Sequence, residues 1–349
     1  MSTFNIGTRT VGEGCPAFIV AEVSANHKQD LNLALETICA AKEAGADAVK
    51  FQTYTPDTIT IDCQNEYFQI KQGTIWDGRT LYELYKEAYT PWGWFEELSA
   101  KARSEGIIFF STPFDKKAVE FLEMLDVPAY KVASYEITDV ALIRCVAARG
   151  KPVLISTGIA LQEDVEEAVN TCLSVGNKDI ALLKCTSKYP APLDEINLKG
   201  IELLKDRFDT VVGLSDHSKG IDVAIAAVAL GAQIIEKHFI IDRRFGGPDS
   251  VFSLEPKELK ALVESVRNVE MALGDYILNS PHKIKKAKEH ARSIFVVEDI
   301  KAGEPFTAKK VRSIRPGYGL HPRYLKDILK KKAKCDIQRG TPMDWKFVE

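Results

Sequence analysis

The chain has 349 residues, of which 45% are hydrophobic and 27% charged, with a formal net charge of -3 at pH 7. This is ordinary globular composition, long enough for one large domain and a small one. No apolar run reaches the roughly 18 residues of a membrane span, and MSTFNIGTRT lacks the apolar stretch of a signal peptide, so we expect a cytoplasmic protein that binds no membrane.

From residue 17 to about 273 the sequence alternates short, β-branched apolar runs with longer amphipathic stretches, which is the pattern of strand–helix units. Eight runs are present, at residues 17–24, 48–53, 106–112, 129–134, 152–157, 180–187, 211–216 and 233–239. Helical patterns lie between them, for example at 31–45, 116–126, 162–176 and 222–232. Eight such units in about 250 residues favour a (β/α)8 barrel over a doubly wound sheet.

One connection, residues 54–90, departs from this rhythm because it is much longer than the others. A loop of this length in a compact domain usually serves as a lid or a specificity element. We therefore expect this connection to take part in function.

After Leu273 the strand–helix pattern stops, and we predict three parts: a barrel at 1–273, a linker at 274–290 and a second domain at 291–349. From Lys283 to Glu349 the chain holds 18 Lys and Arg against 8 Asp and Glu. A basic segment can indicate nucleic acid binding, but no recognition motif accompanies this one. We favour docking on an acidic partner surface that receives anionic substrates, and expect no nucleic acid partner.

Polar side chains recur at or near the ends of the apolar runs, where barrel enzymes build their active sites. They are Glu22, Lys50, Thr112, Lys131, Ser134, Ser156, Ser187, Ser215 and His238. Ionisable groups within buried parallel strands are costly unless they are used, so Lys50 and Lys131 are the strongest candidates.

Two histidines, His217 after the seventh run and His238 at the end of the eighth, occupy neighbouring strand ends. Two imidazoles beside carboxylates can hold a divalent metal and leave positions open for water and a substrate carbonyl. The alternative is that both are ordinary hydrogen-bonding residues, but their placement favours the metal. Asp216 could orient an imidazole or cap the following helix, and capping is the commoner role of an isolated Asp.

The lysines and hydroxyls suit a small polyanion that carries phosphate and carboxylate groups. This set consists of Lys50, Thr112, Lys131, Ser134, Ser156 and Ser215. The alternative is that the lysines form structural salt bridges with Glu22 or Glu136, which would be an expensive use of two buried lysines. Glu22, Glu136, Asp249 and Tyr189 form a third set, in which each residue alone is a weak signal.

The ordered segments of this chain resemble the sialic acid synthase family over nearly its whole length. They are AEVSANH, GADAVKFQTY, FFSTPF, AYKVASYE, ISTGIA, KCTSKYP, GLSDHS, EKHF and GGPDSVFSLEP. The C-terminal part resembles the antifreeze-like (SAF) domain of these synthases. Within the family, WDGRTLYELYKEAYTPW in the long connection is most similar to the pseudaminic acid synthases.

The resemblance implies an α/β fold, a (β/α)8 TIM barrel followed by a small SAF domain, and a transferase that condenses phosphoenolpyruvate with an aldehyde amino sugar. Residues matching Lys50, Thr112, Lys131, Ser134, Ser156 and Ser215 bind phosphoenolpyruvate in similar enzymes, and those matching His217 and His238 hold a divalent metal, Mn or Mg. Those matching Glu22, Glu136, Tyr189 and Asp249 line the acceptor or water side. The Arg matching Arg315 reaches the acceptor from the partner subunit, which implies a domain-swapped homodimer.

The implied acceptor is 2,4-diacetamido-2,4,6-trideoxy-L-altrose. The alternatives are N-acetylneuraminate or legionaminate synthesis, or another phosphoenolpyruvate aldol-type synthase, although synthases of shorter acids would not need the C-terminal domain. An ice-binding module is the rival for that domain, and the lysine-rich stretch at 329–334 argues against a flat, weakly charged surface. Glu22 is the candidate to position or deprotonate the attacking water.

Overall fold

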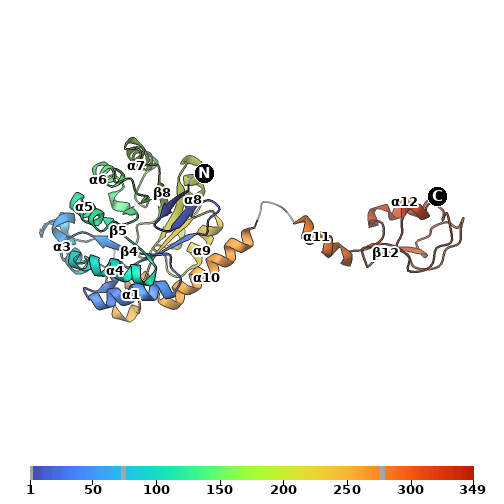
Figure 1. Ribbon diagram of the computed structural model, residues 1–349, viewed down its shortest axis with the longest axis horizontal. Helices are drawn as coiled ribbons and strands as arrows, with labels where there is room; N and C mark the ends of the chain where they lie inside the picture. The colour runs from blue at the N-terminus through green and yellow to red at the C-terminus, as the bar shows by residue number, and fades with distance from the viewer. Residues whose placement is uncertain (1–2, 72–75, 275–279) are drawn as a thin grey trace. The chain divides into compact units, whose positions relative to one another are not determined.

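The computed structural model describes residues 3–71, 76–274 and 280–349 (Figure 1). It divides into two compact units, Met1–Gly274 and Asp275–Glu349. Each unit has its own hydrophobic core.

Within the described residues of the first unit, eight parallel strands close into a barrel in which each strand pairs with its sequence neighbour and the last pairs with the first. The strands are β3 (Phe18–Glu22), β4 (Ala48–Thr53), β5 (Ile108–Pro113), β6 (Tyr130–Val132), β7 (Val153–Ser156), β8 (Ile180–Cys185), β9 (Val211–Asp216) and β10 (Ile234–His238). Each overlaps one of the eight runs predicted from the sequence, so the predicted (β/α)8 barrel is confirmed.

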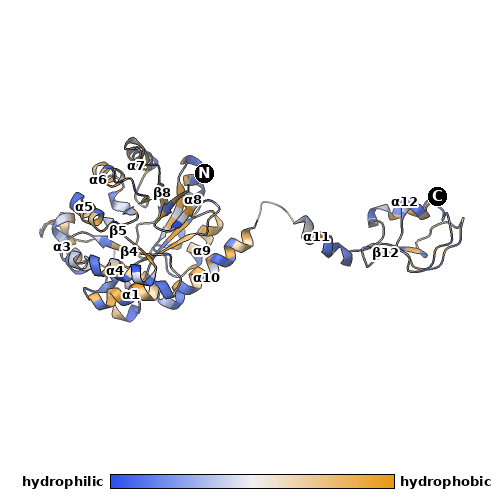
Figure 2. Cartoon of the chain, viewed as in Figure 1, coloured by the Kyte–Doolittle hydropathy of each residue, from blue (hydrophilic) through white to orange (hydrophobic). Residues whose placement is uncertain are grey.

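Helices surround the barrel and cover the outer face of the strands (Figure 1). They are α1 (Leu31–Glu43), α4 (Phe95–Glu105), α5 (Lys116–Met124), α6 (Val140–Ala147), α7 (Gln162–Ser174), α8 (Gly200–Arg207), α9 (Asp222–Ala229) and α10 (Pro256–Leu273). The strands are buried on both faces, which explains their continuous apolar sequences, and Figure 2 shows hydrophobic colour on the central strands. Gly213 is needed for close strand packing, since a Cβ there would lie 2.5 Å from the carbonyl oxygen of Ile234.

An antiparallel hairpin of β1 (Thr3–Ile6) and β2 (Arg9–Gly12) precedes the barrel and was not predicted from the sequence. Phe4, Ile6 and Val11 are buried in the barrel core. Strands of four residues give too few alternations of apolar and polar side chains for a pattern to be recognised.

The long connection after β4 contains α2 (Pro56–Ile59), a 3₁₀ turn at Glu66–Phe68 and α3 (Leu81–Ala88). Helix α3 begins with a capping box, in which Thr80 accepts from the backbone N–H of Glu83 and Glu83 accepts from that of Thr80. This cap fixes where the helix starts.

The second unit contains α11 (Pro281–Ala287), a 3₁₀ turn (Lys288–His290), β11 (Ser293–Val296), β12 (Val311–Ile314) and α12 (Leu325–Ile328). Strands β11 and β12 pair antiparallel over a small core that includes Ile294, Phe306 and Ile328. Of the linker predicted at 274–290, residues 275–279 lie outside the described residues, and residues 281–290 form α11 and the 3₁₀ turn. Of the described helices in either unit, none is both long and apolar enough to cross a bilayer.

Candidate active site

The carboxyl ends of the barrel strands surround a cavity of about 1180 Å³. Twelve of the thirteen residues to which the resemblance gave a role line it, namely Glu22, Lys50, Thr112, Lys131, Ser134, Glu136, Ser156, Tyr189, Ser215, His217, His238 and Asp249. The strand-end Ser187 lines it as well. The structure brings them together because parallel strands all end at the same rim of a barrel.

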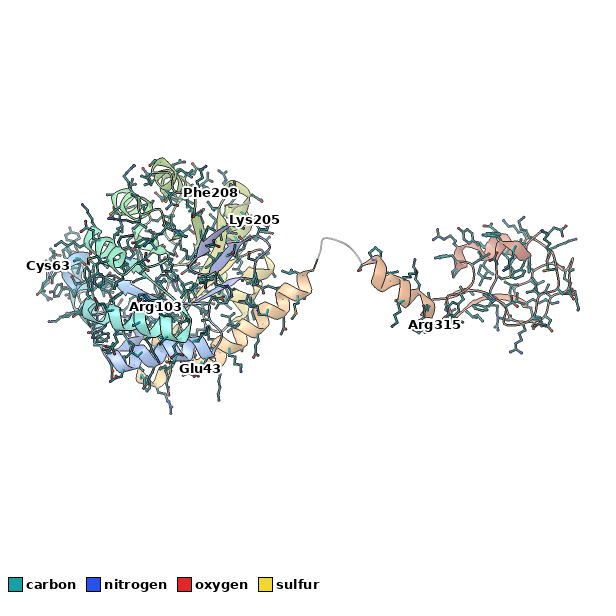
Figure 3. The ribbon with its side chains drawn as sticks, in the orientation of Figure 1. Glu43, Cys63, Arg103, Lys205, Phe208 and Arg315 are labelled. Atoms are coloured by element: carbon teal, nitrogen blue, oxygen red, sulfur yellow. The ribbon has the colours of Figure 1, made fainter. Side chains whose placement is uncertain are left out.

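The thirteenth residue, Arg315, lies in the second unit just after β12, where Figure 3 labels it. Its side chain is exposed. Within the part of the chain that the structure describes, its guanidinium makes no hydrogen bond or ion pair, so it is available to a ligand or a partner.

Four charged side chains of alternating sign fill the floor of the cavity, and all four are buried. Lys50 Nζ lies 2.5 Å from Glu22 Oε2 and 3.7 Å from Glu236 Oε2, and Lys131 Nζ lies 2.9 Å from Glu236 Oε1. The sequence left open that these lysines form salt bridges with Glu22 or Glu136. Lys50 does form one with Glu22, whereas Lys131 pairs with Glu236 and not with Glu136.

The two carboxyl groups of this floor differ in their electrostatics. Burial raises the pKa of Glu22, although Lys50 opposes the shift. Burial acts on Glu236 too, but Lys131 and Lys50 outweigh it and hold the pKa of Glu236 below its usual value. The two lysines therefore favour the charged form of Glu236 more strongly than that of Glu22.

Glu236 was missed in the sequence, although a signal was present. It lies inside the eighth apolar run, two residues before His238, and residues two apart on a strand face the same side. The reasoning that selected Lys50, an ionisable group within a buried strand, applies equally to Glu236. Gln52 was also missed; it lines the cavity and donates to Glu22 Oε1 at 2.9 Å.

The two histidines are buried with ring centroids 5.3 Å apart. His217 Nδ1 lies 2.9 Å from the Thr186 carbonyl oxygen, so in the neutral ring this nitrogen donates and Nε2 has the lone pair. Burial lowers the pKa of His217, but Cys185 and the Thr186 carbonyl outweigh it and leave that pKa raised. His238 Nδ1 has no hydrogen-bond partner among the described residues and lies 3.7 Å from Asp249 Oδ2. Burial and the neighbouring His217 hold the pKa of His238 well below its usual value.

These features fit a divalent metal, because a neutral imidazole with a free lone pair is the form that binds one. An unpartnered buried nitrogen beside a carboxylate supports the same assignment. Across the residues that the structure describes, no cluster of three or more His, Cys, Asp or Glu side chains has the spacing of a metal site. The protein would therefore supply the two imidazoles, with water and substrate completing the coordination.

Asp216 performs neither of the roles considered from the sequence. Its carboxylate accepts from the Ser218 backbone N–H at 2.8 Å and pairs with Lys237 Nζ at 2.7 Å, and α9 starts later with Ile221 as its N-cap. Asp216 and Lys237 immediately precede His217 and His238. Their buried pair joins β9 to β10 and thereby fixes the strand ends that carry the histidines.

Hydroxyl groups form a second part of the lining. Ser187 Oγ donates to Ser134 Oγ at 2.8 Å, and Thr112 Oγ1 accepts from Lys50 Nζ at 3.1 Å. The buried Ser156 Oγ has no hydrogen-bond partner among the described residues. Gly158 leaves room here, since a Cβ would lie 2.3 Å from Ser187 Oγ. Two lysines and an unsatisfied hydroxyl in one cavity are donors of the kind that an anion accepts from.

Glu136 follows β6 in a 3₁₀ turn at Ser134–Glu136. Burial raises its pKa to about 7, although Lys131 opposes the shift, and Glu136 Oε2 is buried with no hydrogen-bond partner among the described residues. A carboxyl group that titrates near neutrality can both take up and release a proton at physiological pH.

Comparison with known proteins assigns the family. Residues 37–277 match the NeuB family and residues 291–349 match the SAF domain. The chain belongs to the NeuB family, and it ends in a SAF domain, as the sequence motifs indicated.

Similar proteins cover almost the full chain. Pseudaminic acid synthase of Campylobacter jejuni is 48% identical over 93% of this chain and 95% of its own, and that of Helicobacter pylori is 44% identical over 96% and 98%. The crystal structure of N-acetylneuraminic acid synthetase from Leptospira borgpetersenii, in complex with citrate, has a TM-score of 0.74 and 34% identity, over 82% of this chain and 95% of the other.

Proposed function

We propose that this enzyme is a pseudaminic acid synthase. It condenses phosphoenolpyruvate with 2,4-diacetamido-2,4,6-trideoxy-L-altrose and water to give a nonulosonic acid and phosphate. The observation that carries this proposal is the 48% and 44% identity to two pseudaminic acid synthases over more than nine-tenths of each chain. The test is release of phosphate from phosphoenolpyruvate with matched acceptor sugars.

The anion site of the cavity suits phosphoenolpyruvate. Lys50 and Lys131 supply positive charge, and the hydroxyls of Thr112, Ser134, Ser156 and Ser215 supply hydrogen bonds. Each lysine is paired with a buried carboxylate, Lys50 with Glu22 and Lys131 with Glu236. Burial opposes the charged form of Lys50, but Glu22 and Glu236 outweigh it and raise the pKa of Lys50. A phosphate with a neighbouring carboxylate would meet donors already arranged for it.

His217 and His238 would hold a divalent metal, Mn or Mg, which would polarise the carbonyl of the open-chain aldehyde. The free lone pair on His217 Nε2 and the unpartnered His238 Nδ1 support these assignments. Tyr189 packs against His217 with ring centroids 4.3 Å apart, so the acceptor would lie beside both rings. Asp249, near His238, lines the same side.

In the reaction, C3 of the enol phosphate attacks the aldehyde carbon, the aldehyde oxygen takes up a proton, and positive charge develops at C2. Water then adds to C2 and gives its proton to Glu22, whose raised pKa suits a base. The tetrahedral intermediate expels phosphate by C–O cleavage, its C2 hydroxyl proton passes to the departing phosphate, and the keto acid remains. Glu136, with a pKa near 7, is the group that we assign to protonate the former aldehyde oxygen.

We also propose that the enzyme acts as a domain-swapped homodimer in the cytoplasm, where phosphoenolpyruvate is made. Large apolar side chains are exposed in the loops at the strand ends: Tyr67 is 82%, Leu193 72% and Tyr135 55% exposed. An apolar rim of this kind favours coverage by a partner. Arg315, exposed and without a partner among the described residues, would reach the acceptor from the other subunit.

A further inference from the structure

The lining of the cavity has two sides of different chemistry. The barrel strands contribute the lysines, carboxylates and hydroxyls described above. The connection at 54–90 contributes side chains that are almost all apolar or aromatic, including Tyr54, Trp76 and four residues of α3. Phosphoenolpyruvate is a polyanion without a methyl group, so this second side does not match its chemistry.

Helix α3 turns its apolar face toward the cavity. Leu81, Leu84, Tyr85 and Ala88 all line it, and they follow the i, i+3, i+4, i+7 spacing of one helical face. The opposite face carries exposed charges, such as Lys86 and Glu87. An amphipathic helix normally covers a protein core with its apolar face. Part of this face instead bounds a cavity, and Leu81, Tyr85 and Ala88 remain only half-buried.

Aromatic rings of this cavity lie against the histidine pair. The Trp76 ring lies 5.5 Å from the Tyr189 ring, centroid to centroid, and Tyr189 packs on His217. The Trp76 indole N–H donates to the Pro248 carbonyl oxygen at 3.2 Å, which fixes the ring beside Asp249. Tyr85 is held by an edge-to-face contact with Tyr54 at 5.6 Å. A sugar with its aldehyde at the histidines would extend toward this surface.

We propose that Leu81, Leu84, Tyr85 and Ala88 form the surface that selects the acceptor, by contacting the acetamido methyl groups and the deoxy carbon of the amino sugar. This inference rests on the proposed function and adds to it the element that recognises the substrate. Methyl groups gain by leaving water against such a surface. A hydroxyl in the same place would lose its hydrogen bonds to water without a replacement.

The test compares Leu81→Asn with Lys86→Asn, which places the same residue on the exposed face of the same helix. We expect Leu81→Asn to raise KM for the diacetamido trideoxy sugar about tenfold, the cost of lost contact with a methyl group. Its preference for this sugar over N-acetylmannosamine should fall by a similar factor, while KM for phosphoenolpyruvate stays within about twofold of wild type. Ala88→Ser, a smaller change, should reduce the preference in the same direction.

Lys86→Asn should leave the preference unchanged. If Leu81→Asn and Ala88→Ser both retain the wild-type preference between the two sugars, the surface does not select the acceptor and the inference is wrong.

Binding measurements separate this inference from the proposed function. Phospholactate, which lacks the enol double bond, replaces phosphoenolpyruvate, and calorimetry follows binding of the diacetamido sugar. Tight binding to wild type and about tenfold weaker binding to Leu81→Asn support the inference, even if wild type releases no phosphate with the true substrates. Equal affinity of the two proteins, or no binding to wild type, overturns it.

Discussion

Lys131 and Glu236 form a buried ion pair of 2.9 Å across the inside of the barrel. They come from β6 and β10, which are four strands apart in either direction around the barrel. Glu236 also lies 3.7 Å from Lys50 and accepts from Ser215 Oγ at 2.9 Å. Glu236 therefore interacts with both lysines of the anion site, while Glu22 forms the closer pair with Lys50.

Glu236→Gln should lower Tm by several degrees, because removing one member of a buried pair costs about 3 kcal/mol or more. Phosphoenolpyruvate should restore more stability to this variant than it adds to wild type, since the anion replaces the lost negative charge. Thermal unfolding with and without phosphoenolpyruvate measures both effects.

The matched control is Asp216→Asn, which breaks the buried pair with Lys237 outside the cavity. It should be destabilised without any extra gain from phosphoenolpyruvate. Equal gains in the two variants would mean that Glu236 does not balance the anion site.

His217→Ala and His238→Ala should each remove bound divalent metal and lower turnover at least about 100-fold, with the far-ultraviolet circular dichroism unchanged. His217 and His238 are the two protein ligands that we assign to the metal, so the loss of either leaves a single imidazole to hold it. Metal analysis of the purified proteins is the measurement. His290→Ala, an exposed position in the second unit, should keep its metal; full occupancy in both cavity variants would contradict the metal site.

The sequence predicted the barrel well because buried parallel strands are continuous apolar runs, and eight of them were visible. The convergence of twelve site residues followed from their common position at strand ends. The sequence did not predict the hairpin that contains Phe4 and Val11, because its strands are too short to show a pattern. Glu236 was missed because it lies within its strand, two residues before the end at His238. The role of Asp216 depends on Lys237 of the neighbouring strand, and chain order does not reveal that contact.

Glu136→Gln should stabilise the protein at high pH. Burial raises the pKa of Glu136 from 4.5 to about 7, so the folded state favours the neutral form. The stability contributed by that form is fully present below about pH 4.5 and is lost as pH rises through about 7. The Gln variant should therefore gain up to about 3 kcal/mol relative to wild type between pH 5 and pH 8.

Thermal or denaturant unfolding of both proteins at the two pH values measures this difference. The exposed substitution Glu96→Gln serves as the control and should show no such trend. A Tm difference between Glu136→Gln and wild type that does not change with pH would refute the raised pKa.

Mixing Lys131→Ala and Arg315→Ala chains should restore activity if Arg315 acts from the partner subunit. Each variant alone should be nearly inactive, because each removes a cation from every site. A heterodimer of a swapped enzyme contains one site with both defects and one site with neither. Phosphate release by co-expressed chains, with heterodimers verified by two affinity tags, should approach half the wild-type rate per heterodimer; activity no higher than that of the separate variants would contradict the trans arrangement.

The most direct test of the proposed function is phosphate release from phosphoenolpyruvate with three acceptors offered separately. These are 2,4-diacetamido-2,4,6-trideoxy-L-altrose, the corresponding mannose-type diacetamido sugar and N-acetylmannosamine. We predict the highest kcat/KM with the altrose sugar, by at least about tenfold, and a nine-carbon keto acid by mass spectrometry. Faster reaction with either of the other two would assign legionaminate or neuraminate synthesis instead, and no phosphate release with any of the three would contradict a synthase of this class.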